Sequence, residues 1–159
     1  TGQGGPYKVF TPFWRAFEAR SSFPAPLGKP RRWSFPADWP PSLDLAQLAS
    51  LPEHPWSGKL ASHWTPGERG AGTRLKRFLR GPIDNYLTGR DMPALEGVSA
   101  LSPHLHWGEI SPAQIWHAAG ALESTAGRQA FLRQLVWREF AHHLLYHFPQ
   151  LTEIGRAHV

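Results

Sequence analysis

The amino-acid sequence predicts an all-α fold that is preceded by an irregular, proline-rich segment. From residue 65 onward, apolar residues recur at helical spacing, and several segments begin with a Ser-Pro or Thr-Pro pair. No alternating run typical of a strand follows residue 12. Eight prolines lie between residues 24 and 55, where they disfavour long helices and central strands because proline lacks an N–H and fixes φ.

Residues 1–60 are expected to form a connector. Its YKVF segment (7–10) is a candidate for a short extended piece, and Thr11-Pro12 has the form of a helix start, with the helix running to about residue 20. Aromatic rings then alternate with the prolines. Because a flexible linker has no need of such rings, we expect this stretch to lie against a surface. The rings are Trp33, Phe35, Trp39 and Trp56.

Residues 61–159 are expected to form packed helices. The spacing of Thr65-Pro66-Gly67-Glu68 is that of a capping box, with Pro66 at the first helical position and Gly81 at the end of that helix. Pro82 begins a short helix through Tyr86. The apolar positions expected to face the core in the helices around residues 75 and 115 are Leu75, Phe78, Leu79, Ile115, Trp116, Ala119 and Leu122.

The remaining helix starts follow the same pattern. Ser102-Pro103 and Ser111-Pro112 each combine a capping residue with a proline at the first turn. Gly127 precedes the last long helix, which Pro149 terminates.

The composition limits the kinds of protein that this chain can be. The chain has 159 residues, 41% of them hydrophobic, which is enough to form a core. It contains no cysteine and no apolar run of membrane-spanning length, and its net charge of +5 favours phosphate-bearing partners. We therefore expect a cytoplasmic, bacterial-type intracellular protein. Because the chain starts with Thr-Gly, we read it as part of a longer one.

The loop EGVSALSPHLHWG, residues 96–108, is a candidate anion-binding site. Gly97 permits an unusual backbone turn, and Ser99 and Ser102 supply hydroxyl groups. Ser102-Pro103 also starts a helix, whose free N–H groups favour an anion such as a diphosphate. The alternative is an ordinary capped turn, since Ser-x-x-Ser spacing is common at helix starts.

The helix FLRQLVWREFAHHLLYHFP, residues 131–149, places polar side chains among large apolar ones. Residues four apart share a helix face. One face is thus expected to hold Phe131, Gln134, Arg138 and His142, with Trp137 at its edge. An amide, a guanidinium and aromatic rings suit a ligand that has phosphates and a flat heterocycle.

The other faces of this helix are apolar, so we expect it to be buried, with Leu132, Leu135, Val136 and Phe140 toward the core. A buried Arg138 then needs Glu139, Asp91 or a ligand anion as its partner. The alternative to a ligand site is a purely structural pair of Arg138 and Glu139.

Three other features have weaker interpretations. His143 and His147 are four residues apart, as zinc ligands can be, but no third ligand is evident and no metal site is predicted. The basic stretch 69–80 is either a solvated face or a phosphate-contacting face. No nucleophile elbow, P-loop or G-x-G-x-x-G motif is present, so the chemistry of an enzyme of this sequence would come from a cofactor.

Taken together, these segments resemble the DNA photolyase/cryptochrome family, and within it the class I deoxyribodipyrimidine photolyases. The matching segments are YKVFTPFW (7–14), PGERGAGTRLKRFL (66–79), Tyr86 with GRDMPALEGVSALSPHLHWGEISP (89–112), and FLRQLVWREFAHHLLYHFP (131–149). The last two are long, ordered and specific. The resemblance covers nearly the whole chain, which corresponds to the middle of a family member.

The resemblance implies that residues 61–159 are the N-terminal part of a helical FAD-binding domain. The residues that match positions around the flavin are Tyr86, Val98, Ser99, Ala100, Leu101, Ser102, Phe131, Gln134 and Arg138. Those that match positions at damaged DNA are Arg90, Trp137 and Arg138. Gln134 and Trp137 match the positions that contact the lesion during catalysis.

The implied reaction is the repair of cyclobutane pyrimidine dimers. Light excites reduced FAD, which passes an electron to the dimer, and the electron returns after the ring splits. The implied partner is UV-damaged DNA, and the implied whole protein is a monomer. An antenna chromophore would be bound by an N-terminal domain outside these residues. Because these residues would form only one half of the flavin site, we expect residues 1–159 alone to bind FAD weakly or not at all.

Three positions depart from the family pattern. Gln134 stands where dimer photolyases have a glutamate, Val98 where threonine is common, and Phe131 where tryptophan is common. An amide can donate a hydrogen bond to a thymine carbonyl but has no proton to give up. Gln134 therefore leaves open a cryptochrome-type signalling flavoprotein or a six-four photoproduct photolyase. A helical nucleic-acid-binding protein without a cofactor is a third possibility.

Overall fold

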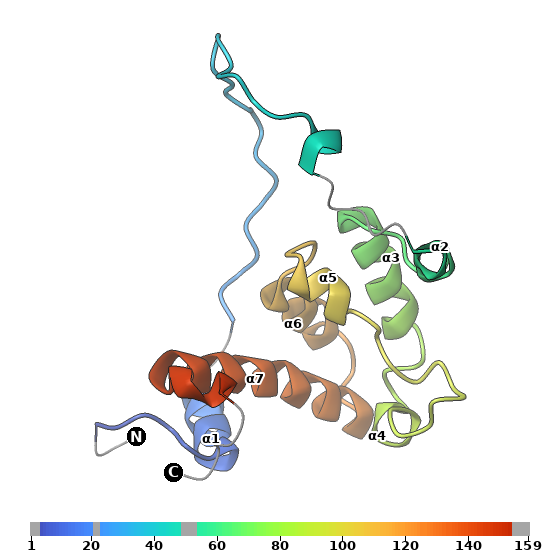
Figure 1. Ribbon diagram of the computed structural model, residues 1–159. Coiled ribbons are helices and arrows are strands. Elements are labelled where there is room, and N and C mark those ends of the chain that lie inside the picture. The colour runs from blue at the N-terminus through green and yellow to red at the C-terminus, as the bar shows by residue number, and fades with distance from the viewer. Residues whose placement is uncertain (1–3, 21–22, 49–53, 154–159) are drawn as a thin grey trace.

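The computed structural model describes residues 4–20, 23–48 and 54–153, and these contain helices and irregular segments but no strand (Figure 1). The predicted all-α class is confirmed for this part of the chain. The elements are α1 (Phe10–Arg20), η1 (Leu45–Leu48), α2 (Trp56–Ala61), α3 (Glu68–Leu79), α4 (Tyr86–Gly89), α5 (Ser102–His106), α6 (Pro112–Gly120), α7 (Ala126–His147) and η2 (Pro149–Thr152). In the described residues, no helix has the length and apolar character needed to cross a bilayer.

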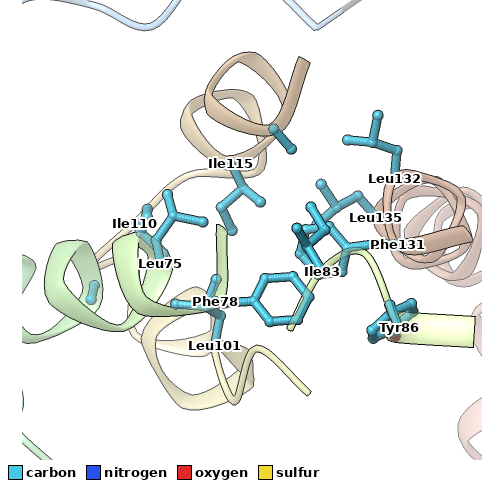
Figure 2. Packing of buried hydrophobic residues seen from close by; sticks show 12 residues of the cluster. Leu75, Phe78, Ile83, Tyr86, Leu101, Ile110, Ile115, Phe131, Leu132 and Leu135 are labelled. Atoms are coloured by element: carbon cyan, nitrogen blue, oxygen red, sulfur yellow. The ribbon is translucent and has the colours of Figure 1, made fainter. Parts of the chain in front are cut away.

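Helix α7 organises the fold, because α1, α4, α6 and η2 all pack against it (Figure 1). One side of α7 contributes to the larger core, where side chains from α3, the 83–86 turn, α6 and α7 meet (Figure 2). The central residues of this core are Phe78, Ile83, Leu101, Ile115, Phe131 and Leu135. Burial of such side chains stabilises the fold by about 1.5–3 kcal/mol each.

A second, smaller core joins α1 to the C-terminal half of α7. Its buried members are Phe10, Val136 and Phe140, and rings from α1 pack around them. Helix α1 lies within the segment predicted as connector, yet it is fastened to the helical part of the chain by this cluster. Helix α7 therefore contributes one face to the larger core and another face to the smaller core.

The prediction that α7 is buried nearly all round was wrong. The predicted core positions Leu132, Leu135, Val136 and Phe140 are buried, but Gln134 and Trp137 are exposed. Because the two cores lie on different sides of α7, a polar stripe is left facing outward between and beside them. The polar residues in the middle of this helix thus need no buried partners.

Several helix starts differ from the predictions, while others agree with them. Ser111 accepts a hydrogen bond from the Gln114 N–H in a complete capping box, as the Ser111-Pro112 pair suggested. Helix α3, by contrast, begins at Glu68 and has no side-chain cap. Gly67 has φ of +92°, outside the helical region, so the helix cannot extend back to Pro66.

Three further helix starts differ from the predictions. Helix α7 begins at Ala126, one residue before Gly127, because Thr125 caps it by accepting a hydrogen bond from the Arg128 N–H at 3.1 Å. Helix α5 begins at Ser102 itself, with Leu101 at the N-cap position. The short helix predicted from Pro82 forms later, as α4 from Tyr86.

Beyond its first two residues, the proline-rich segment does not lie against the described helices, although the sequence predicted that it lies against a surface. Phe23 packs on Trp116 of α6 with ring centroids 5.4 Å apart, and His117 Nε2 lies 3.0 Å from the Phe23 carbonyl oxygen. From residue 25 onward the segment extends away from the helices (Figure 1). Trp33, Phe35 and Trp39 are 72%, 67% and 68% exposed, and the rings of Phe35 and Trp39 contact each other with their centroids 6.0 Å apart. Prolines remove the N–H groups that would join this segment to another element.

Candidate functional site

A pocket of about 360 Å³ lies where the 99–105 segment faces α7. Its polar lining comes from Tyr86, Ser99, Ser102, Gln134 and Arg138. Its apolar lining consists of Leu101, Leu105, Ile115, Phe131 and Leu135. Seven of the nine residues predicted to bind a cofactor therefore meet at one place, although they come from three separate segments of the sequence.

The wall that α7 provides follows from helical spacing. Phe131, Gln134 and Arg138 are three and four residues apart, so their side chains project from one face. Phe131 is 5% exposed, and its ring lies 4.7 Å from the Phe78 ring and 5.4 Å from the Tyr86 ring, measured between centroids (Figure 2). This aromatic cluster fixes the base of the pocket, while the polar ends of Gln134 and Arg138 stand above it.

The opposite wall is a loop held in an unusual conformation. A Cβ atom added to Gly97 would lie 2.4 Å from the carbonyl carbon and oxygen of Gly89, so only glycine allows these two segments to cross. Ala100 has φ of +49°, a left-handed conformation that costs about 1 kcal/mol or more for a residue with a side chain. Ser99 thus lies between a close backbone crossing and a left-handed residue.

The serines of this loop do not form the ordinary capped turn that was the alternative prediction. No side chain caps α5, whose N-cap residue is Leu101. The Ser99 Oγ instead accepts a hydrogen bond from the Leu101 N–H at 3.4 Å, which leaves its hydroxyl proton free to donate. Ser102 lines the pocket from the first residue of α5. Both hydroxyls are therefore positioned at the pocket.

Arg138 has one of the partners that the sequence suggested. Its Nη1 donates to Glu139 Oε1 at 3.1 Å, and both side chains are about one-third exposed. A guanidinium has five N–H donors, so this single hydrogen bond leaves others that can reach an anion in the pocket. The pair with Glu139 is structural, but it does not use up the binding capacity of Arg138.

Tyr86 stays protonated at neutral pH. Burial raises the pKa of its hydroxyl, and the nearby positive charge of Arg90 opposes this effect. The Arg90 guanidinium lies 5.9 Å from the centre of the Tyr86 ring and pairs with Asp91 at 3.6 Å. Tyr86 is therefore a hydroxyl donor on the pocket wall, beside a cation.

Trp137 and Arg90, predicted to contact DNA, lie outside the pocket lining. The Trp137 ring stacks on Phe10 of α1, with centroids 3.7 Å apart and planes inclined by 9°. Trp137 is nevertheless 43% exposed, so part of the indole remains accessible. It precedes Arg138 on α7, at the edge of the polar face as predicted.

Some residues near the site were missed by sequence reasoning. Leu105, Ile115 and Leu135 line the pocket, but apolar residues at helical spacing give no signal that separates a pocket wall from a core. Phe10 was missed because its partner, Trp137, lies far away in the sequence. Val98 and Ala100 were predicted for the pocket but line a neighbouring cavity, described below.

The histidines of α7 serve other contacts. His143 accepts a hydrogen bond from the Tyr7 N–H at 3.0 Å through its Nε2 atom, which ties the segment before α1 to α7. His142, predicted for the ligand-facing side, is exposed and does not line the pocket. In the part of the chain that the structure describes, no group of three or more His, Asp or Glu side chains is placed to hold a metal ion.

The chain is similar to proteins named deoxyribodipyrimidine photo-lyase. It is 45% identical to one from Agrobacterium fabrum over 157 residues, and 34% identical to one from Escherichia coli over 161 residues. Both alignments cover 96% of this chain but 33% and 32% of the relatives, so the chain spans about a third of their length. No family model matches the chain.

A solved structure agrees with these alignments. The crystal structure of a bacterial class III photolyase from Agrobacterium tumefaciens superimposes with a TM-score of 0.88 at 45% sequence identity. The match covers 95% of this chain and 32% of that one.

Proposed function

Because this chain belongs to the DNA photolyase/cryptochrome family, we propose that it forms the first part of the flavin-binding domain of a light-driven DNA-repair enzyme. The reaction proposed is the splitting of cyclobutane pyrimidine dimers. The observation that carries the proposal is the pocket in which Ser99 and Ser102 face Gln134 and Arg138. Since the chain spans about a third of its relatives, the activity belongs to the complete polypeptide.

The class within the family is also a proposal. The motifs of the sequence suggested a class I-like photolyase, whereas the solved relative at 45% identity is described as class III. We assign the chain to class III, because this identity extends over 95% of its length. In either class the relatives are described as photolyases, which favours repair over signalling.

The lining of the pocket fits part of an FAD molecule. Two serine hydroxyls, the protonated Tyr86 hydroxyl and the free N–H groups of Arg138 are donors suited to phosphate and ribityl oxygens. Phe131 and Leu135 supply an apolar base. The volume of about 360 Å³ is at the lower end of the ~300–1,000 Å³ typical of ligand pockets. We infer that this chain holds one side of the cofactor.

When bound and reduced, FAD supplies the light-excited electron that splits the dimer. The residues of this chain have supporting tasks. Arg138 and the serines would hold and orient the phosphate portion, and the apolar base would exclude water beneath it. Gln134 can donate an amide N–H to a pyrimidine carbonyl at the pocket mouth, but it cannot transfer a proton.

The accessible part of Trp137 provides a place for a flipped-out pyrimidine dimer. A dimer inside a duplex cannot reach a buried cofactor, so the two nucleotides must leave the base stack. The indole of Trp137, held from one side by Phe10, presents a flat apolar surface near Gln134. Arg90, beside Tyr86, is positioned to neutralise a backbone phosphate.

The test of this function uses the complete polypeptide that carries this chain. The flavin is reduced, an oligonucleotide with one thymine cyclobutane dimer is added, and dimer loss is followed in blue light and in the dark. Loss in the light alone is expected. Retention of the dimer under both conditions, with flavin bound, would contradict the proposal.

A second candidate is a six-four photoproduct photolyase or a cryptochrome-type signalling protein, and Gln134 is the residue that favours it. The family resemblance implies a glutamate at this position whose carboxyl group contacts the dimer, and here an amide stands in its place. The same assay with a six-four photoproduct separates repair of that lesion from the absence of repair. We further propose a cytoplasmic monomer, a connector over residues 1–60, and an antenna chromophore held outside this chain.

A further inference from the structure

A second cavity, of about 480 Å³, lies between α3 and the 95–100 segment. Among the described residues, the two cavities share Ser99 alone. Phe78 forms part of its base, and Leu95 and Val98 are apolar parts of its wall. This cavity is larger than the proposed flavin pocket, and the repair mechanism above gives it no task.

Three arginines of α3 line this cavity. Arg69 and Arg77 are two helical turns apart with Thr73 between them, so all three residues share one face of α3. Arg74 lines the cavity from the adjacent position. The sequence alone is compatible with either a solvated face or a phosphate-contacting face in this basic stretch. Because these arginines converge on a concave surface, a phosphate-contacting face is favoured over a solvated one.

Arg74 is held in a defined position. Its Nη2 donates to the His63 carbonyl oxygen at 2.8 Å, and its guanidinium lies 4.5 Å from the centre of the Trp64 ring. A guanidinium fixed by an aromatic ring and a carbonyl loses little additional freedom when it binds an anion. Arg74 is therefore a preorganised donor at the rim of the cavity.

The other two arginines are available to a ligand. Arg77 pairs with Glu96, but their side chains are 71% and 76% exposed, and such a pair contributes little stability. Arg69 forms no ion pair in the described part of the chain. Against these three cations the lining contains one acidic residue, Glu96, which leaves a net charge of +2. In a concave surface whose net charge has one sign, the electrostatic field of the charges is concentrated.

We propose that this cavity binds a phosphate group carried by a nucleotide. Guanidinium groups match phosphate oxygens in pairs, and the net charge of +2 compensates a phosphate dianion. The apolar wall formed by Leu95 and Val98 has room for a base or sugar. The phosphate comes either from the DNA backbone or from a free nucleotide. The inference does not depend on flavin in the neighbouring pocket.

The test measures binding of inorganic pyrophosphate and of AMP to the complete polypeptide by calorimetry. Arg69→Gln and Arg77→Gln are each expected to weaken binding of these probes about tenfold or more, because each removes charge-assisted hydrogen bonds. Arg80→Gln is the matched control, since Arg80 ends α3 without lining the cavity, and it is expected to change affinity less than about twofold.

Glu96→Gln is expected to have the opposite effect on affinity. It therefore controls for variants that lose affinity only because they fold less well. Removing the one acidic group of the lining raises the net charge and frees Arg77, so pyrophosphate should bind more tightly. A variant that merely damages the structure cannot produce a gain. An unchanged or weaker affinity in Glu96→Gln would overturn the proposal.

Competition separates the two sources of phosphate. If pyrophosphate displaces undamaged duplex DNA and Arg69→Gln weakens DNA binding, the natural ligand is the DNA backbone. If AMP binds and leaves DNA affinity unchanged, the ligand is a free nucleotide. Absence of binding by both small probes, with DNA affinity equal in Arg69→Gln and Arg80→Gln, refutes the site. Flavin absorbance of the same samples reports on the other pocket independently.

Discussion

The stack of Phe10 on Trp137 predicts that one ring on α1 controls both the docking of α1 and the orientation of Trp137. Phe10 is 4% exposed, and its ring lies 3.7 Å from Trp137 and 5.8 Å from Phe140. The Arg133 guanidinium lies 5.4 Å from the same ring. Phe10→Leu keeps most of the apolar volume but removes these ring interactions.

The expected loss follows from these contacts. Replacing one apolar side chain by another of similar volume costs less than about 1.5 kcal/mol, and an aromatic pair adds about 0.5–1.5 kcal/mol beyond its buried area. We expect Phe10→Leu to destabilise the docking of α1 by about 1–2 kcal/mol. Since 1–2 kcal/mol corresponds to roughly a 5- to 30-fold change in an opening equilibrium, the amides of α1 should exchange faster by this factor.

Hydrogen–deuterium exchange on the complete polypeptide measures this local opening. Phe35→Leu is the control, because Phe35 is 67% exposed and makes no contact with α1 or α7. A double-mutant cycle with Trp137→Leu should give a coupling of about 0.5–1.5 kcal/mol. Unchanged exchange in Phe10→Leu, or a coupling of zero, would refute the role assigned to the stack.

Three further predictions concern other parts of the chain. Gly97→Ala should destabilise the protein by about 1–3 kcal/mol in thermal unfolding, because the new Cβ would lie 2.4 Å from Gly89 backbone atoms, while Gly81→Ala, with open space around its Cβ, should cost much less. Burial and the neighbouring His147 lower the pKa of His143, so the folded state binds fewer protons than the unfolded state. Protection of the Tyr7–His143 contact from exchange should therefore fall as the pH drops through about 6.5, and a contact equally protected at pH 8 and pH 5 would contradict this. Residues 1–159 alone should bind FAD weakly or not at all in a fluorescence titration, and stoichiometric binding would show that the pocket is complete without other segments.

Local sequence patterns predicted most of the helices and half of the buried residues of the larger core, while Leu122, predicted to face the core, is 38% exposed. The cap at Ser111 depends on residues within one helical turn, and the burial of Ile115 and Val136 follows from apolar residues spaced along a single helix. Such short-range patterns can be recognised in the sequence. The predictions failed where the structure is determined by backbone geometry or by packing between segments that are far apart in the sequence. The positive φ of Gly67 excludes Pro66 from α3, and the two-sided packing of α7 exposes Gln134.

Seven of the nine residues predicted to bind a cofactor line one pocket, and they were singled out because they occur in two specific motifs. Spacing alone allowed the Ser99–Ser102 loop to be either an anion site or a capped turn. The structure gives α5 no side-chain cap, which argues against the capped turn, and the anion site stays a prediction. The stack of Trp137 on Phe10 could not be predicted, since no local pattern links α1 to α7. The cavity lined by Arg69 and Arg77 likewise depends on a loop more than ten residues away.

The central claim, that the pocket between the Ser99–Ser102 loop and α7 holds the flavin, is tested most directly by flavin content. The complete polypeptide is purified as Arg138→Gln and Ser102→Ala, with Arg15→Gln on the exposed side of α1 as the control. FAD affinity should fall about tenfold or more in Arg138→Gln, by a smaller factor in Ser102→Ala, and not in the control. Equal flavin affinity in all three variants would contradict the assignment of this pocket.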